Sequence, residues 1–291
     1  MSYTQYEIGE HLEPARARFV MRKLPHVTVL FWGIKIIATT LGETAGDLLA
    51  QTLRIGYLLS TVILVGLFLI SLVFQLRAGR FHAPLFWTVV ALTSTAGTTL
   101  SDFMNRTGGL GYTGGALVLS TALAVVFVVW RRSGQTLDVE NLATFKGELL
   151  FWIAILVSNS LGTSTGDFMS DTLGLGFRTT ALILSAIMLA LAVAHYRTKV
   201  NGTLLFWIAF VLTRPLGTVF GNILSKEHER GGLNFGTVWT SGALFGVLMA
   251  LVAYQLVQVR RRPLRPLPVP VHRRTGHPQR PNGSLVASSA A

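Results

Sequence analysis

Apolar residues along the chain fall into eight segments, each about as long as a membrane-spanning helix. A helix needs about 20 consecutive apolar residues to cross a bilayer. Lipid cannot satisfy open backbone groups, so each segment is predicted to be helical. The predicted spans are residues 27–46, 55–75, 84–102, 111–130, 149–167, 177–195, 204–223 and 237–257. The pattern therefore predicts an all-α, polytopic membrane helical bundle with eight transmembrane helices.

The eight segments form four copies of a two-helix unit. Each copy begins with a Phe-Trp dipeptide and carries a short glycine motif, which reads GETAGD, GTTLSD, GTSTGD or GTVFGN. Marks that recur at fixed spacing in every copy indicate a repeat architecture. Because each unit crosses the membrane twice, the four repeats are predicted to be parallel, unlike the inverted repeats of many transporters. The predicted divisions are an N-terminal segment 1–23, a membrane domain 24–257 with repeats 24–80, 81–145, 146–200 and 201–257, and a disordered Pro/Arg-rich tail 258–291.

Charge supports the membrane class and predicts an orientation. Only 13% of the residues are charged, against about 25% in soluble proteins. Eighteen of the 25 Lys and Arg residues lie at the termini or between repeats. The loops inside the repeats hold only Arg54, Arg106, Arg178, Lys226 and Arg230. The positive-inside rule therefore places both termini in the cytoplasm. The distribution favours anionic lipid at the basic tail rather than nucleic acid as the partner of the +12 net charge.

The first helix of every repeat carries a polar ladder. We number each repeat from its tryptophan, so that register 7 is the seventh residue after it. Registers 7, 11 and 15 hold, in order, Thr39, Ser94, Asn159 and Arg214; Glu43, Thr98, Thr163 and Thr218; Asp47, Asp102, Asp167 and Asn222. Steps of four residues keep these side chains on one helical face. We predict that the four first helices lie inside with their ladders facing one another, and that the second helices lie outside, toward lipid.

Small residues accompany the ladder at registers 10 and 14. They are Gly42, Gly46, Gly97, Ser101, Gly162, Gly166, Gly217 and Gly221. Small residues four apart let helix backbones approach closely in a membrane. One interpretation is that the motif is only a packing face. The other is that the acids beside these glycines bind something.

Acids and bases within the predicted spans need partners. A carboxylate at the depth of Glu43 costs a few kcal/mol unless it is paired or hydrated. Lys35 lies close to the inner interface, which its side chain could reach, and the Phe-Trp pairs are expected there as aromatic anchors. Arg214 lies deeper. We therefore predict a Glu43–Arg214 ion pair, structural or gating, with Lys35 as the second candidate base. The register-15 aspartates either end their helices in wet headgroups or line a hydrated core.

The ladder offers a hard, oxygen-only ligand set. Carboxylate, hydroxyl and amide oxygens suit protons, Na⁺, Mg²⁺, Ca²⁺ or Mn²⁺ rather than soft metals. The candidate ion-binding residues are Glu43, Asp47, Asp102, Asp167, Asn222, Thr39, Ser94, Asn159, Thr98 and Thr163. The chain has no cysteine, which excludes thiolate sites and disulfides. It carries no Walker, HExxH, GxSxG or dinucleotide motif, so neither a cofactor nor an enzymatic activity is expected.

The repeat resembles that of a bacterial family of uncharacterised membrane-anchored proteins with an FW…TxGExxGD-like signature. The stretch FWGIKIIATTLGETAGD carries the resemblance most clearly, followed by FWIAILVSNSLGTSTGD, and residues 24–257 are covered. The second repeat departs from the signature at Ser101 and the fourth at Asn222. The resemblance implies a multi-pass protein of the bacterial inner (plasma) membrane in which the Gly-Asp motif matters.

Two functions remain open at this point. The leading prediction is a secondary transporter or exporter of a small cation, a proton or a hard divalent metal, through the polar core. The alternative is a non-transporting membrane scaffold or sensor whose ladders only pack helices together. The pattern predicts no oligomeric state.

Overall fold

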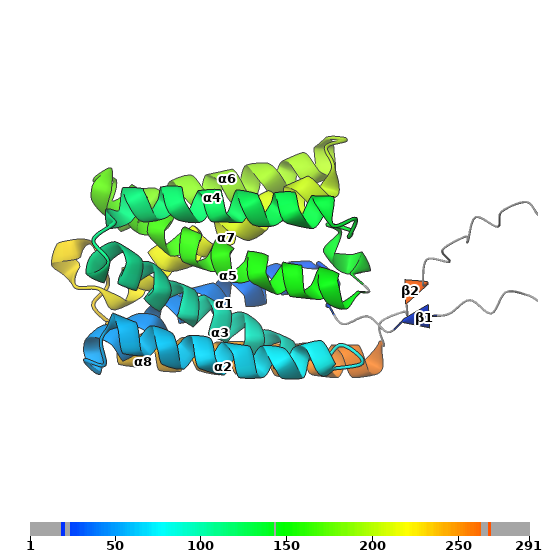
Figure 1. Cartoon of the computed structure of the whole chain (residues 1–291). Coiled ribbons are helices and arrows are strands. Elements are labelled where there is room, and N and C mark those ends of the chain that lie inside the picture. The colour runs from blue at the N-terminus through cyan, green and yellow to red at the C-terminus, as the bar shows by residue number, and fades with distance from the viewer. Residues whose placement is uncertain (1–18, 21–23, 143, 263–266, 269–291) are drawn as a thin grey trace, which may run out of the picture.

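The computed structural model of the chain describes residues 19–20, 24–142, 144–262 and 267–268. Eight long helices make up most of this part (Figure 1). They are α1 (Val29–Asp47), α2 (Tyr57–Arg77), α3 (Ala83–Asp102), α4 (Gly111–Arg132), α5 (Phe145–Asp167), α6 (Gly176–Arg197), α7 (Gly202–Ser225) and α8 (Gly236–Arg261). Each predicted span coincides with one of these helices, and the main differences are the earlier start of α5 and the later end of α8.

Short elements connect the helices. They are the π-helical turns η1 (Leu48–Thr52), η2 (Phe103–Thr107) and η4 (Phe168–Thr172), the 3-10 turns η3 (Val139–Asn141) and η5 (His228–Arg230), and the antiparallel strands β1 (Phe19–Val20) and β2 (Leu267–Pro268). The prediction of a disordered tail is wrong where the tail is described, because α8 continues into it and β2 pairs with β1. The rest of the tail and most of the predicted N-terminal segment lie outside the described residues.

Local signals start the helices. The Thr28 hydroxyl accepts a hydrogen bond from the Phe31 N–H at 3.3 Å, which caps α1. The Thr144 hydroxyl caps α5 in the same way. Such side chains satisfy backbone donors that have no partner in the first helical turn. Before α2, Gly56 has a φ of 82°, a conformation that glycine adopts without steric cost.

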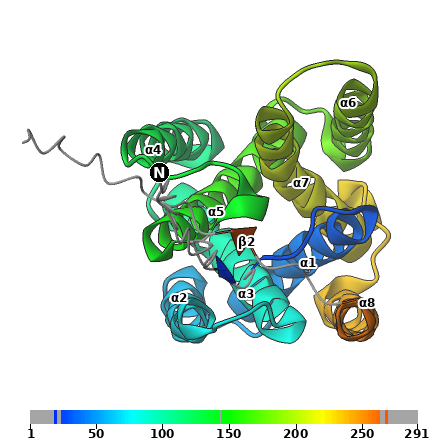
Figure 2. The same ribbon diagram turned by 90° about the vertical axis from the view of Figure 1, so that its right-hand side faces the viewer.

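The odd-numbered helices α1, α3, α5 and α7 form a closed inner ring. Each contacts the odd-numbered helix before and after it, and α7 contacts α1. Seen end-on, these four helices surround the axis while α2, α4, α6 and α8 stand at the corners (Figure 2). Each even-numbered helix packs mainly on the inner helix of the next repeat, with α8 on α1. The predicted arrangement of first helices inside and second helices outside is confirmed.

The outer helices expose apolar faces. We compare the most apolar 18 residues of each helix. In the inner helices α5 and α7, 67% of these residues are buried, whereas in the outer helices α4, α6 and α8 only 22% are buried. Six helices of the described chain are long and apolar enough to cross a membrane: α2, α4, α5 with η4, α6, α7 and α8. The polar ladders lower the hydropathy of α1 and α3, which lie inside the ring. The apolar outer faces indicate a multi-pass membrane protein.

The Phe-Trp dipeptides close one end of the ring. The phenylalanine of each repeat contacts the tryptophan of the next at Phe31–Trp87, Phe86–Trp152, Phe151–Trp207 and Phe206–Trp32, with centroids 5.6, 5.6, 6.1 and 5.7 Å apart. The prediction of interfacial anchors is wrong for most of these rings, because neighbouring inner helices bury them; Trp152 is 0% exposed.

Candidate functional site

The small residues of one repeat hold the ladder of the next in place. A Cβ atom on Gly97 would lie 2.8 Å from Asn159 Cβ, and one on Gly46 would lie 2.9 Å from Thr98 Cβ. The same contact recurs around the ring at Gly42–Ser94, Gly162–Arg214, Gly217–Thr39, Gly166–Thr218 and Gly221–Glu43. Side chains larger than hydrogen would force the backbones apart at these points. Registers 10 and 14 thus bring registers 7 and 11 to the axis.

Arg214 extends across the inner ring from α7. Its side chain is fully buried, and its Nη atoms donate to the carbonyl oxygens of Thr39 on α1 and Ser94 on α3, both at 3.1 Å. Its Nη2 lies 3.5 Å from Glu43 Oε2. The structure therefore contains the predicted Glu43–Arg214 ion pair, and one side chain joins three of the four inner helices.

The Glu43 carboxylate accepts hydrogen bonds from both neighbouring inner helices. Thr218 Oγ1 donates to Glu43 Oε2 at 3.0 Å and Thr98 Oγ1 donates to the same atom at 3.3 Å. Arg214 also donates to both threonine hydroxyls. A buried ion pair withstands dehydration only when further hydrogen bonds satisfy its remaining donors and acceptors. Registers 7 and 11 supply these hydrogen bonds to both Nη atoms and to the carboxylate, while Arg214 Nε has no partner in the described chain.

Lys35 is enclosed in the ring rather than directed to an interface. Its exposure is 0%, and its Nζ lies 4.2 Å from the centroid of the Phe210 ring on α7. Within the described residues this Nζ has no hydrogen-bond partner. The expectation that Lys35 reaches the inner interface is wrong, because its face of α1 points at α7.

At the end of the ring opposite the Phe-Trp dipeptides, two of the register-15 aspartates form ion pairs with basic side chains. Asp47 lies 2.5 Å from Lys226 Nζ, and Asp102 lies 3.2 Å from Arg106 Nε. Both carboxylates are 2% exposed, so they do not end their helices in an open surface. Each of these two carboxylates is therefore paired with its own base.

The third aspartate has a neutral partner. Asp167 is 3% exposed, and Asn222 Nδ2 donates to its Oδ1 at 3.4 Å. No ion pair to Asp167 occurs among the residues that the structure describes. The helix turn after it carries Asp171 instead of a base, so Asp167 differs in kind from the other two.

The residues that distinguish the three aspartates lie at register 19, which the sequence reasoning missed. Register 19 holds Gln51, Arg106, Asp171 and Lys226. Registers 7, 11 and 15 are four residues apart, so register 19 is the next position on the same helical face. Lys226 was instead expected to lie in a solvated loop, and its partner Asp47 is 179 residues away in the sequence.

A π-helical turn follows each aspartate. η1, η2 and η4 begin directly after Asp47, Asp102 and Asp167, whereas α7 continues as a regular helix past Asn222. Such turns are frequent at functional sites. The backbone remains helical through these turns, so each aspartate lies about one turn before the end of its helix.

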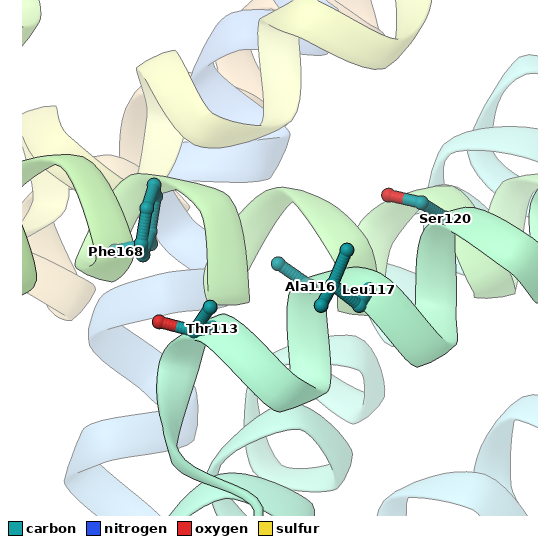
Figure 3. A pocket seen from close by; sticks show the side chains of 5 residues that line it. All are labelled: Thr113, Ala116, Leu117, Ser120 and Phe168. Carbon is teal, nitrogen blue, oxygen red and sulfur yellow. The ribbon is translucent and has the colours of Figure 1, made fainter.

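Two pockets lie on the outer surface of the helix bundle. One, of about 140 Å³, is lined by Thr113, Ala116, Leu117 and Ser120 of α4 and by Phe168 (Figure 3). Another lies beside the start of α8 and includes Trp239. Neither is lined by a ladder residue. In the described part of the chain, no group of three His, Cys, Asp or Glu side chains could hold a metal ion.

The comparisons with known proteins address the repeat. A family model described as "Repeat of Unknown Function (DUF347)" matches residues 30–81, 85–136, 150–201 and 205–261. The chain belongs to the DUF347 repeat family. Each DUF347 match contains one inner and one outer helix, so the family unit is the structural unit of the ring. No curated protein and no solved structure matched the chain.

Proposed function

We propose that the protein is a secondary transporter or exporter of a small cation that passes along the axis of the inner ring. The observation that carries the proposal is the continuous column of buried polar side chains from Lys35 to the register-15 aspartates. Buried ionisable groups in membrane helices are costly and mark ion or substrate pathways. Helices that only needed to adhere could have used small and apolar residues alone.

The charges favour a monovalent cation, H⁺ or Na⁺, over the divalent metal also considered. Glu43, Asp47 and Asp102 each have an arginine or lysine partner. Among these buried acids, Asp167 alone has no ion pair in the described chain, and its partner is the Asn222 amide. One uncompensated carboxylate matches a single positive charge, whereas divalent cations are usually bound by several oxygen ligands with more negative charge.

The proposed topology has eight spans in four parallel repeats, in the bacterial inner membrane with both termini in the cytoplasm. The six apolar helices support six spans directly. α1 and α3 are proposed to cross as well, because their polar faces are enclosed by the ring. The excess of Lys and Arg on the Phe-Trp side supports a cytoplasmic location for that side.

The proposed transport cycle opens a path that is closed in this structure. The Phe-Trp rings close one end, and Arg214 crosses the middle with Glu43 as its anion. Separation of this pair would allow an ion to move between Asp167 and the opposite end. The pair is therefore proposed to be the gate.

The alternative, a non-transporting scaffold or sensor, is favoured by a different observation. The glycine contacts are tight around the whole ring, and Arg214 ties three helices together. A protein selected for a rigid core alone would have these features. Such a protein would carry no flux, and changes in the ladder would lower only its stability.

Flux in proteoliposomes tests the proposal against this alternative. Vesicles holding wild type should dissipate an imposed Na⁺ or proton gradient faster than protein-free vesicles, and the Asp102→Asn/Asp167→Asn variant should not. Size-exclusion chromatography of each variant before reconstitution shows whether a lost signal reflects a packing defect rather than a lost ion pathway. Absence of flux for both ions in wild type would contradict transport and leave the scaffold. Unchanged flux in the double variant would show that these acids do not carry the ion.

A further inference from the structure

Asn222 donates its amide N–H to Asp167 and carries an amide oxygen that is unused. Its Nδ2 donates to Asp167 Oδ1 at 3.4 Å, so the amide group points at the carboxylate. The amide Oδ1 is buried and has no hydrogen-bond partner in the described chain, and the residue is 4% exposed. A buried acceptor without a donor costs free energy unless a ligand or water completes it. Here the unused acceptor lies beside a carboxylate.

Thr163 adds a second unused oxygen on the same helix face. It lies one turn before Asp167 on α5 and is 0% exposed. Its register-11 equivalents Thr98 and Thr218 both donate to Glu43. The Thr163 hydroxyl has no partner among the described residues. The register-11 hydroxyl on α5 is therefore unused, whereas its equivalents on α3 and α7 bind Glu43.

The local charge favours a cation. The charged side chains that interact with Asp167 include the acids Glu43, Asp102 and Asp171 and the bases Arg106 and Arg214, of which Arg214 is already paired with Glu43. Arg106 is already bonded to Asp102. The C-terminal end of α5 adds the negative end of its helix dipole. Helix C-terminal ends of this kind coordinate Na⁺ in membrane transporters.

We propose that Asp167, Asn222 and Thr163 form a binding site for one small monovalent metal cation of the Na⁺ type. The carboxylate supplies the charge, and the amide and hydroxyl oxygens supply neutral ligands. This deepens the proposed transport function, on which the site's purpose rests, but binding itself can be measured without transport. Hard oxygen donors with a single negative charge match such an ion.

The test is thermal unfolding of the detergent-purified protein as NaCl replaces choline chloride at constant ionic strength. Ligands that bind the folded state raise the unfolding midpoint with a saturable dependence on concentration. Wild type should show such a rise with Na⁺. Asp167→Asn should abolish it, and Thr163→Val, which keeps the shape of the side chain, should shift half-saturation to higher Na⁺. Glu229→Gln is the matched control, because it removes an exposed acid that does not act on Asp167 and should leave the rise intact.

Two results would overturn the site. One is a wild-type midpoint that does not distinguish Na⁺ from choline. The other is a Na⁺-dependent rise that persists unchanged in Asp167→Asn and Thr163→Val. If Asp167→Asn does not fold, Thr163→Val decides alone. Flux measurements separate this inference from the proposed function: Na⁺ binding without flux supports the site and contradicts transport. Flux in a protein without Asp167-dependent binding contradicts the site and leaves transport standing.

Discussion

Replacing Glu43 by glutamine tests whether the axial ion pair is as dehydrated as the geometry indicates. The substitution preserves side-chain volume and an acceptor for Thr218 but leaves the Arg214 guanidinium without its anion. The two side chains are 4% and 0% exposed. Removing one partner of such a buried pair costs about 3–5 kcal/mol, whereas an exposed pair contributes about 0–1 kcal/mol. We expect the larger cost, which corresponds to a fall in midpoint on the order of 10 °C.

The double variant Glu43→Met/Arg214→Met completes the test. Methionine fills much of the volume of either side chain without a charge. Replacing a whole buried ion pair by apolar residues is often neutral, or stabilising by about 1–4 kcal/mol. The double variant should therefore be more stable than Glu43→Met or Arg214→Met alone. Its coupling would show that the two charges are paired in the folded protein.

The assay is reversible unfolding in detergent or bicelles, followed by tryptophan fluorescence, with Glu229→Gln as an exposed control. If Glu43→Gln costs no more than Glu229→Gln, the pair is hydrated and the closed axis is an incorrect reading of the contacts. If the double variant loses the sum of the two single losses, the charges act independently and the gate has no basis.

Three further changes probe the rest of the ring by the same unfolding assay. Gly162→Leu should prevent folding or reduce stability severely, because its Cβ meets Pro215 Cδ at 2.9 Å, whereas Gly66→Leu on the open face of α2 should be tolerated; equal losses would contradict the packing role. Trp152→Ala should cost about 3–5 kcal/mol, since the ring is fully buried, and a loss below 1 kcal/mol would contradict the aromatic closure. Asp102→Asn should destabilise mildly, because Arg106 is partly exposed, and Arg106→Gln added to it should restore stability; no recovery would argue against this pairing.

Much of the architecture was predictable from the sequence because one register repeats. The four-residue step of the ladder and the small residues beside it require one face of every first helix to meet a neighbour closely. That requirement placed the first helices inside. It also predicted the Glu43–Arg214 pair, since each residue replaces a smaller polar one in an otherwise uniform ring.

The remaining features depend on which repeat follows which around the ring. Lys226 reaches Asp47 only because α7 lies against α1, and nothing local in either stretch indicates that closure. The Phe-Trp dipeptides were misread for a related reason. The same dipeptide suits a membrane interface or a buried layer, and the choice follows from the neighbouring inner helix. The difference between Asp167 and the other aspartates likewise appears only when register 19 is seen in space.

The proposed topology requires α3, despite its polar ladder, to cross the membrane inside the ring. Single-cysteine labelling of sealed inner-membrane vesicles with an impermeant thiol reagent tests it directly, because the chain has no cysteine of its own. Arg80→Cys and Thr107→Cys flank α3 and are exposed. We predict that they label from opposite sides, with Arg80→Cys on the cytoplasmic side and Ser133→Cys with it. Labelling of Arg80→Cys and Thr107→Cys from the same side would contradict the eight-span ring and the transport path built on it.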